Sequence, residues 1–467
     1  MAENKSYFFC GIGGSGMFPL ATIIAARNHG VSGSDRSHDQ GRSADKFRWI
    51  QDRGIALFPQ DGSGVQPGQT LVASAAVEDH VPDIAAAIKF GLPRLTRAEL
   101  NAQLFNAAAQ SIGIGGTSGK STVTGMIAWI MECEGLHPTV MNGAVMRNFS
   151  SPENPFASAL AGDPARYVSE VDESDGSIAL YQPDVAIITN ISLDHKSLEE
   201  LQQFFGDFAA KARVAVVNAD DPESAPLLRL GQIGRVGVSS FGFSEEAVMR
   251  GTDFTPLPHG CRFMAHFAGE AVDVCLAMPG RHNAANALAA MAATAALNIP
   301  VQRAAATLAS FKGLARRYEV LGQQSGVTLI DDFGHNPDKV AATLAAAAEL
   351  PGRLLLFFQP HGYGPLRQMG RELAASFANG MRAGDQLYIC DPVYFGGTVD
   401  RSIGSAQLAA DVRAQGQQAH YLATRAECAA ALLSEAKAGD RIIILGARDD
   451  SLTDFGQQLL AKLAARA

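Results

Sequence analysis

Short apolar runs alternate with helix-length segments along almost the whole chain. The run at 6–12 is followed by a Gly-rich turn, by an apolar segment at 17–30 that predicts a helix, and by a second run at 31–35. This order of strand, turn, helix and strand is typical of a doubly wound α/β unit. The run at 70–76 fits a further strand of the same sheet, and the Ala-rich stretch at 96–110 is interpreted as a connector between domains.

The same alternation returns in two later regions of the chain. It predicts parallel sheets, because each apolar strand is separated from the next by a helical segment. Helices are expected at 122–135 and 282–299, and strands at 165–175, 184–192, 213–221, 327–333, 353–360, 385–391 and 441–449. A chain of 467 residues is too long for one ordinary core, so we expect roughly three domains.

The composition narrows the class of protein. Apolar residues make up 47% of the chain and charged residues 18%, as in α/β proteins rich in Ala and Gly. The net charge of -9 and the lack of Lys/Arg runs argue against a nucleic-acid surface. Six cysteines without a CxxC pair indicate reduced thiols, and no segment reads as a signal peptide or membrane span. We therefore expect a cytoplasmic protein whose partners are small molecules, with no nucleic acid and no membrane.

The first Gly-rich turn contains Gly11, Gly13 and Gly16 in GxGxxG spacing, between a predicted strand and a predicted helix. Asp35 ends the next strand, as in a dinucleotide-binding fingerprint that holds a pyrophosphate at a helix N-terminus. NAD is one ligand that this pattern allows. The alternative is that the glycines only permit tight packing of the helix on the sheet.

A second Gly-rich stretch, GIGGTSGKST at 113–122, resembles a phosphate-binding P-loop. It is a shifted variant of the strict pattern, because Ile114 stands where the first glycine is expected. Backbone N–H groups of such a loop bind phosphate oxygens, the Lys120 ammonium reaches the terminal phosphates, and a hydroxyl of Ser121 or Thr122 can ligate Mg²⁺. A Gly-rich loop without a ligand would not explain this Lys-Ser-Thr sequence.

Acidic residues follow a predicted strand at 170–175, where ligands gather in open parallel sheets. Several carboxylates together suit Mg²⁺, and the alternative is an exposed acidic turn without a ligand. His195 follows a neighbouring predicted strand, and the sequence favours a metal ligand and a structural residue equally at this position. The carboxylates are Glu170, Asp172, Glu173 and Asp175, and the second strand end adds Asn190 and Asp194.

Three later motifs contain amides, arginines and histidines whose functions are individually weak predictions. Amides can bind an adenine edge and an arginine can bind phosphate, but helix caps and turn residues have the same composition. The residues are His282, Asn283, Asn286, Arg316, Arg317, Asp331, Asp332, His335 and Asn336.

Taken together and in order, these motifs resemble the Mur ligase family over nearly the whole chain, and within it the alanine-adding members. The motifs are GIGGSGM, VSGSD, EVDESD, NISLDH, GRHNAANALAA, RRYEVLG, DDFGHNP and FQPH. The resemblance implies a three-domain α/β fold and an ATP- and Mg²⁺-dependent ligase of peptidoglycan synthesis, which joins UDP-N-acetylmuramic acid to an amino acid through an acyl-phosphate. The implied domains are a Rossmann-like, UDP-sugar-binding domain at 1–106, a central P-loop ATPase-type domain at 107–314, and a Rossmann-like, amino-acid-binding domain at 315–467.

The resemblance also implies roles for individual residues. Lys120, Glu170, His195 and His335 would be catalytic, and Ser121, Glu170 and His195 would bind Mg²⁺, with Glu173 fitting the spacing less well than Glu170. ATP would contact Gly116, Thr117, Gly119, Lys120, Ser121, Thr122, Asn283, Asn286, Arg317 and Asp332. The substrates would contact Gly13, Ser15, Gly16, Ser34, Asp35 and His361. Some family members carry a carbamylated lysine, but Lys211 is interpreted as a solvated residue at a helix end.

The sequence departs from the alanine-adding pattern at several positions. Ser118 replaces a histidine of the P-loop, Asn336 replaces the second histidine of GHHP, and Gly362 replaces an arginine. The last two lie where the amino acid is expected to dock, and an amino-acid carboxylate normally pairs with an arginine. The acceptor therefore stays open between L-alanine, another amine and a murein peptide. An NAD-dependent oxidoreductase and a nucleotide-binding regulatory paralogue are the alternatives outside the ligases.

Overall fold

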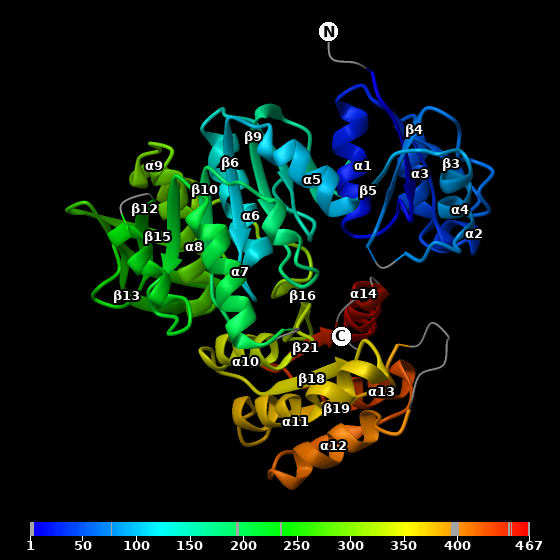
Figure 1. Cartoon of the computed structure of the whole chain (residues 1–467). Coiled ribbons are helices and arrows are strands. Elements are labelled where there is room, and N and C mark those ends of the chain that lie inside the picture. Colours follow the sequence, from blue (N-terminus) through cyan, green and yellow to red (C-terminus); the bar gives the residue numbers. More distant parts are fainter. Residues whose placement is uncertain are drawn as a thin grey trace. The chain divides into compact units, whose positions relative to one another are not determined.

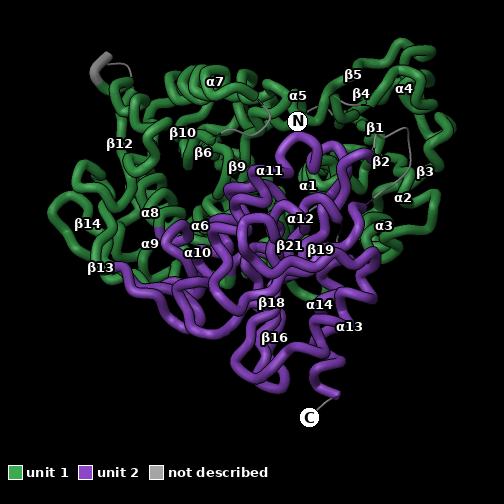
Figure 2. Tube along the Cα trace, turned by 90° about the horizontal axis from the view of Figure 1, so that it is seen from below, with its two compact units in different colours: residues 1–253, 263–275, 285–312 green, residues 254–262, 276–284, 313–467 purple. Residues whose placement is uncertain are grey.

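The computed structural model describes residues 4–75, 77–192, 196–233, 236–393, 401–446, 449 and 451–465. The chain contains three β-sheets with helices between their strands (Figure 1). By its internal contacts it divides into two compact units, which are coloured separately in Figure 2. One unit contains 1–253, 263–275 and 285–312, and the other contains 254–262, 276–284 and 313–467.

The first sheet is parallel and has the strand order β3-β2-β1-β4-β5. Its strands are β1 (Ser6–Cys10), β2 (Gly30–Ser34), β3 (Ala56–Phe58), β4 (Gln69–Ala73) and β5 (Arg94–Thr96). The accompanying helices are α1 (Met17–Ala26), α2 (Arg36–Asp39), α3 (Ala44–Asp52), α4 (Pro82–Lys89) and α5 (Arg97–Asn106). The strand order changes direction beside β1, which puts the turn after β1 at the position where open α/β sheets bind ligands.

The second sheet has ten strands in the order β15-β14-β13-β12-β11-β10-β6-β9-β7-β8. Its strands are β6 (Gln110–Gly115), β7 (Pro138–Met141), β8 (Ala159–Leu160), β9 (Asp163–Glu170), β10 (Val185–Ile188), β11 (Val214–Asn218), β12 (Gly237–Gly242), β13 (Met249–Leu257), β14 (Gly260–Phe267) and β15 (Glu270–Leu276). The helical segments are α6 (Lys120–Cys133), η1 (Ser177–Leu180), α7 (Leu198–Ala210), η2 (Ala225–Ile233), α8 (Arg281–Ala295) and α9 (Val301–Leu308). Because β6 pairs in parallel with both β9 and β10, the carboxyl ends of these three strands meet at one edge.

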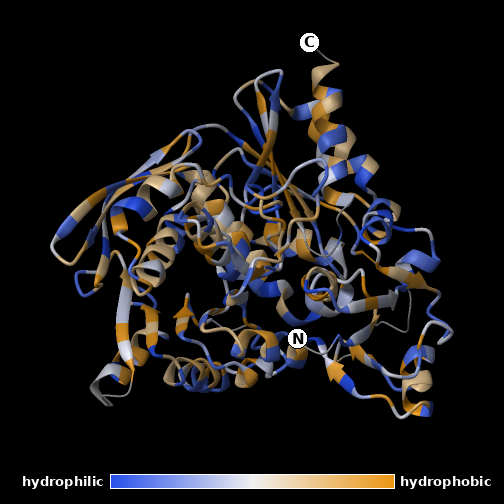
Figure 3. Cartoon of the chain, turned by 90° about the horizontal axis from the view of Figure 1, so that it is seen from above, coloured by the Kyte–Doolittle hydropathy of each residue, from blue (hydrophilic) through white to orange (hydrophobic). Residues whose placement is uncertain are grey.

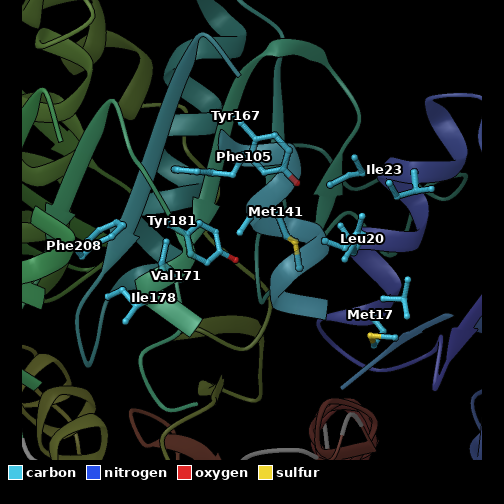
Figure 4. Close-up of a cluster of buried hydrophobic side chains, with 14 of the residues drawn as sticks. Met17, Leu20, Ile23, Phe105, Met141, Tyr167, Val171, Ile178, Tyr181 and Phe208 are labelled. Atoms are coloured by element: carbon cyan, nitrogen blue, oxygen red, sulfur yellow. The ribbon is translucent and has the colours of Figure 1, made fainter. Parts of the chain in front are cut away.

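The first two sheets share one hydrophobic core. Figure 4 shows side chains of α1 beside others from α5, β7 and β9. Tyr167 and Phe105 are fully buried there, with ring centroids 5.9 Å apart. This continuous core explains why the first sheet and most of the second sheet belong to one compact unit.

The third sheet has the order β16-β17-β21-β18-β19-β20 and is parallel except for the β16–β17 pair. Its strands are β16 (Glu319–Gln324), β17 (Val327–Asp332), β18 (Leu354–Gln359), β19 (Gln386–Ile389), β20 (Ala419–Tyr421) and β21 (Arg441–Gly446). Its helices are α10 (Pro337–Ala348), α11 (Tyr363–Gly380), α12 (Ser405–Ala414), α13 (Arg425–Glu435) and α14 (Ser451–Ala464). Separate hydrophobic clusters cover its two faces, so its central strands are apolar on both sides along their middle residues. Hydrophobic and polar residues alternate along α14 in Figure 3, and its Leu452, Leu459 and Leu463 are buried.

The predicted α/β class, with three regions of mostly parallel sheet, is confirmed. The stretch at 96–110 does connect two sheets, but most of it forms α5, which begins with a Thr96–Glu99 capping box and buries Leu100 and Phe105. The strands β3, β5, β7, β8, β12, β13, β14, β15, β16 and β20 were not predicted from the sequence. All six cysteines are free thiols, and no helix among the described residues is long and apolar enough to cross a membrane.

Candidate functional site

The turn between β1 and α1 is closed by a residue from the end of β2. The N–H of Gly13 donates to Asp35 Oδ2 over 2.9 Å, and the N–H of Ser37 donates to Asp35 Oδ1 over 2.7 Å. Both carboxylate oxygens of Asp35 therefore accept backbone hydrogen bonds. In this structure Asp35 shapes the turn and caps α2.

The other residues predicted around this turn differ in exposure. Ser15 is exposed on the turn, whereas Ser34 is fully buried and its hydroxyl donates to the carboxylate of Asp83. A Cβ on Gly16 would lie 2.7 Å from Cδ of Arg97, so the glycine makes room for that side chain. Burial raises the pKa of Asp83, and the hydrogen bond from Ser34 opposes this rise. Ser34 thus contacts the interior of the domain, while Ser15 is accessible to a ligand.

The P-loop leads from β6 into α6, and two of its glycines are required by their surroundings. Gly116 has φ +126° and Gly119 has φ +89°, values that L side chains rarely adopt. A Cβ on Gly116 would lie 2.0 Å from Thr189 Oγ1, and one on Gly119 would lie 2.6 Å from Asn286 Oδ1. Asn286, predicted to bind adenine, therefore lies directly against the P-loop.

The end of the neighbouring strand β10 fixes the middle of the P-loop. The N–H of Ser118 donates to Asn190 Oδ1 over 2.9 Å, and the N–H of Thr117 donates to the Asn190 carbonyl over 3.1 Å. Thr189 Oγ1 donates to the Ser118 carbonyl over 2.6 Å, and Thr117 Oγ1 donates to the Ser192 carbonyl over 3.0 Å. These bonds hold the loop in one conformation, which preorganises it for phosphate.

Lys120 is the first residue of α6. Its ammonium donates to the Gly116 carbonyl over 2.5 Å and to Glu173 Oε2 over 2.9 Å. The Lys120 side chain is 18% exposed and that of Glu173 is 6% exposed, so this ion pair is largely shielded from water. Glu173 follows β9, the strand next to the P-loop strand.

Ser121 and Glu170 are linked through the residues that follow β7. The side-chain amide of Asn142 donates to the Ser121 carbonyl over 3.0 Å, and the next residue, Gly143, donates its N–H to the Glu170 carboxylate. Ser121 and Glu170 offer a hydroxyl and a carboxylate, which are the hard oxygen donors that Mg²⁺ prefers. No group of three or more His, Cys, Asp or Glu residues suited to a metal occurs within the described part of the chain. The remaining predicted ligand, His195, lies outside the described residues.

The remaining residues predicted to bind ATP in this part of the chain are largely buried. Thr122 is 6% exposed on α6, and Asn283 is 3% exposed on α8. The Asn283 side chain donates to the Pro279 carbonyl over 2.7 Å, which ties it to the start of its own helix. Asn283 and Asn286 are three residues apart on α8 and so lie on one side of that helix.

In the second unit, Asp332 organises the turn after β17. Its Oδ2 accepts the N–H of Tyr318 over 2.8 Å, and its Oδ1 accepts the N–H of Gly334 over 2.8 Å and the Thr343 hydroxyl over 2.9 Å. Asp332 is 9% exposed. Asp332, which was predicted to bind nucleotide, therefore stabilises the backbone of this turn through hydrogen bonds.

His335 follows β17 and His361 follows β18, two strands that are separated by β21 in the sheet, and their ring centroids lie 5.1 Å apart at an interplanar angle of 87°. Burial, together with the Lys339 cation, lowers the pKa of His335 to about 2, so its imidazole is neutral at physiological pH. The Arg317 guanidinium lies 4.8 Å from the ring centroid of Phe333, which itself packs against His335. The structure thus gathers Arg317, His335 and His361 at one edge of the third sheet.

The two departures in this region have clear structural environments. Asn336 is 4% exposed and caps α10 by accepting the N–H of Lys339 over 3.0 Å. Gly362 precedes α11 with φ +156°, so a side chain there would require a different backbone conformation. The exposed Lys211 ends α7 and donates to the Ala179 carbonyl over 2.6 Å, which fits its predicted role at a helix end.

Sequence reasoning missed several residues that shape the site. Asn142 and Gly143 carried a weak signal, an Asn-Gly pair after an apolar strand. Arg97, which covers Gly16 and lies 3.9 Å from Asp172, carried none. The partners of Arg97 come from elements far apart in the sequence, so no local pattern reveals them.

Three family models match consecutive parts of the chain. They are described as Mur ligase family, catalytic domain (residues 6–109), Mur ligase middle domain (114–294) and Mur ligase, glutamate ligase domain (316–448). A protein of Novosphingobium aromaticivorans named UDP-N-acetylmuramate--L-alanine ligase is 33% identical, with 96% of this chain and 95% of that protein covered. A protein of the same name from Geotalea daltonii is 32% identical, with 97% of each covered.

Solved structures agree with this fold. A UDP-N-acetylmuramate-alanine ligase from Thermotoga maritima matches with a TM-score of 0.81 at 21% identity, over 99% of this chain and 100% of that one. A murein peptide ligase from Psychrobacter arcticus matches with a TM-score of 0.69 at 21% identity, over 98% of this chain and 99% of that one. At these identities the matches show a shared fold.

Proposed function

Because the chain belongs to the Mur ligase family, we propose that it uses ATP to join the carboxylate of UDP-N-acetylmuramic acid to the amine of an amino acid. Its relatives of 32–33% identity carry the corresponding name, UDP-N-acetylmuramate--L-alanine ligase. The reaction is a step of peptidoglycan synthesis, and we propose that it takes place in the cytoplasm. Its partners are small molecules.

The P-loop is the observation that carries this proposal. Gly116 and Gly119 leave no space for a side chain, and Asn190 and Thr189 hold the residues between them. Such a rigid loop at the N-terminus of a helix binds phosphate through backbone N–H groups. An oxidoreductase built on the first Gly-rich turn would leave this second nucleotide loop unexplained.

We assign ATP to the P-loop and to α8. Gly116, Thr117 and Gly119 supply the loop backbone, Lys120 neutralises terminal phosphates, and Thr122 follows on α6. We assign Asn283 and Asn286 to binding the adenine. Arg317 and Asp332, which belong to the C-terminal domain, are also assigned to ATP.

Ser121, Glu170 and His195 are the proposed Mg²⁺ ligands. The oxygen donors of Ser121 and Glu170 fit this ion, and the Gly143 N–H orients the Glu170 carboxylate. When bound, Mg²⁺ would neutralise negative charge on the reacting phosphate and carboxylate.

We assign the UDP-sugar to the first sheet. Gly13, Ser15 and Gly16 form the turn before α1, and the Ser34 carbonyl and the Asp35 carboxylate support it from the end of β2. A helix N-terminus stabilises a pyrophosphate at this position. The hydrogen bond from Gly13 to Asp35 means that the turn is already folded for its ligand.

The proposed chemistry has two steps. A carboxylate oxygen of the muramate attacks the γ-phosphorus of ATP. The bond between this phosphorus and the oxygen that bridges it to the β-phosphorus breaks, and ADP leaves. The neutral amine of the amino acid then attacks the acyl carbon, phosphate leaves, and the amine loses a proton. Lys120 stabilises phosphate charge, while neutral His335 and His361 are proposed to contact the incoming amine; a pKa lowered to about 2 makes His335 too weak a base to take the amine proton, which passes to water.

L-Alanine is the proposed acceptor, and a different amine is the second candidate. Gly362 and Asn336 favour the second candidate, since a glycine and a buried helix cap offer no cation for an amino-acid carboxylate. A murein peptide is a third acceptor to test, because a murein peptide ligase shares the fold.

The test is phosphate release from ATP and Mg²⁺ with UDP-N-acetylmuramic acid, across L-alanine, glycine, L-serine and the murein tripeptide. Turnover that requires both the UDP-sugar and one amine supports the ligase function and identifies the acceptor. No turnover with any amine, in a protein that binds ATP, would contradict the ligase function and favour a regulatory nucleotide-binding role.

A further inference from the structure

The carboxylate of Glu173 accepts a hydrogen bond from the Lys120 ammonium over 2.9 Å. A second N–H of the same ammonium donates to the Gly116 carbonyl. An ammonium has three donors, so two of the three point at acceptors within the protein. Lys120 is therefore already paired before any phosphate is considered.

The other carboxylates of the acidic segment at 170–175 have different partners. Glu170 accepts the N–H of Gly143, and Asp172 accepts the N–H of Ser174 over 3.0 Å and lies 3.9 Å from Arg97. The exposed Asp175 accepts the N–H of Ser177 over 2.9 Å. Glu173, at 5% exposed, is the carboxylate of this segment that faces the P-loop lysine.

This pairing competes with the assigned task of Lys120. A phosphate group that takes the ammonium leaves a buried carboxylate without its cation, close to further negative charge, which is unfavourable. The Glu173 side chain is too buried for water to replace the ammonium fully. Nucleotide binding must therefore overcome the Lys120–Glu173 pair.

We propose that Glu173 is the resting counter-ion of Lys120, and that ATP binds by exchanging this carboxylate for its own phosphate oxygens. Glu173 is thus a positioning residue that acts through Lys120 and lowers the affinity for nucleotide. The inference rests on the proposed ATP site. The inference predicts that removing the Glu173 carboxylate strengthens ATP binding. The assignment of ATP to the P-loop does not predict this by itself.

The variant Glu173→Gln tests this proposal because it keeps the shape and removes the charge. Titration calorimetry of the full chain with Mg²⁺ should show ATP binding at least about fivefold tighter than in the wild type, as expected for loss of a nearby like charge. Adenosine, which lacks phosphate, should bind equally to both proteins. Steady-state kinetics should show a lower KM for ATP without a rise in kcat.

Asp175→Asn is the matched control, since it removes one negative charge from the same segment at an exposed position. Its ATP affinity should stay within about twofold of the wild type, because water screens an exposed charge. If Glu173→Gln does not fold in a thermal unfolding check, Glu173→Met provides the same readout, because it also removes the charge at similar volume.

Two other outcomes overturn the proposal. If Glu173→Gln binds ATP as tightly as the wild type or more weakly, the Lys120–Glu173 pair only supports the P-loop. The proposed ligase function would then still stand. The absence of ATP binding in the wild type as well as the variant would overturn the proposed ATP site and the inference together.

Discussion

The backbone N–H of Gly13 donates to the carboxylate of Asp35, 22 positions further along the chain. The bond joins the turn after β1 to the end of β2, two adjacent parallel strands. It gives the first Gly-rich turn its shape without a ligand. The acidic residue that the dinucleotide fingerprint assigns to a ribose is here committed to the protein backbone.

Replacing Asp35 by Ala should weaken both the fold and substrate binding. The variant loses two hydrogen bonds to backbone N–H groups, one of which caps α2, and this should cost about 1 to 2 kcal/mol of unfolding free energy. The KM for UDP-N-acetylmuramic acid should rise while the KM for ATP stays near wild type. Urea unfolding and steady-state kinetics measure these effects. Asp61→Ala, which removes an exposed turn carboxylate, is the control and should leave that KM unchanged.

Gly119→Ala should damage ATP use more than stability. The methyl group would lie 2.6 Å from Asn286 Oδ1 and would stand at φ +89°, which costs about 1 to 3 kcal/mol in strain. We expect kcat/KM for ATP to fall at least about tenfold, because the P-loop or Asn286 must move. Gly135→Ala is matched in φ, at +71°, but has open space around it. Equal losses of kcat/KM in both variants would show that backbone strain alone is responsible.

Arg316 and Arg317 are adjacent in sequence and should behave differently on mutation. Arg316 is 7% exposed, pairs with the fully buried Asp331, and donates to the carbonyls of Gly446 and Asp449. Arg316→Ala leaves a buried carboxylate unpaired and should cost about 3 kcal/mol of unfolding free energy. Arg317→Ala should keep the stability and lower kcat/KM for ATP. Denaturant unfolding with parallel kinetics separates the two, and a stability loss in Arg317→Ala would contradict the assignment.

His335 should make the protein sensitive to acid. Its pKa is lowered to about 2 in the folded state by burial and by the cations of Lys339, His361 and Arg317, and is about 6.5 when unfolded. The unfolded state therefore binds more protons below pH 6.5, so stability is complete above that pH and falls as the pH decreases. Between pH 7 and pH 5 the wild type should lose about 1 to 2 kcal/mol from this group.

The variant His335→Gln should show a smaller loss of stability over the same pH range, because glutamine does not titrate. Urea unfolding at the two pH values measures this difference. His137→Gln is the control, since the His137 side chain is 67% exposed, and it should follow the wild-type pH dependence. Identical pH dependence in His335→Gln and wild type would show that folding does not lower the pKa of His335.

The sequence by itself determined the α/β class, many of the central strands, and the two Gly-rich loops. These are local properties, because hydrophobic periodicity and the spacing of glycines are written in short stretches of chain. The P-loop could be predicted down to Lys120, since Gly-Lys-Ser-Thr after an apolar strand has few structural explanations. The order of eight motifs identified the family.

Only the tertiary structure decided which side chains meet. No local pattern favours Arg316 over Arg317 for the interior, or pairs Glu173 with Lys120 and Glu170 with Gly143. Such choices depend on which way each side chain points once the sheets pack, and on partners 15 to 53 positions away. The shared core of the first two sheets is likewise a product of packing, since buried side chains from α1 and β9 fit together only after both sheets have formed.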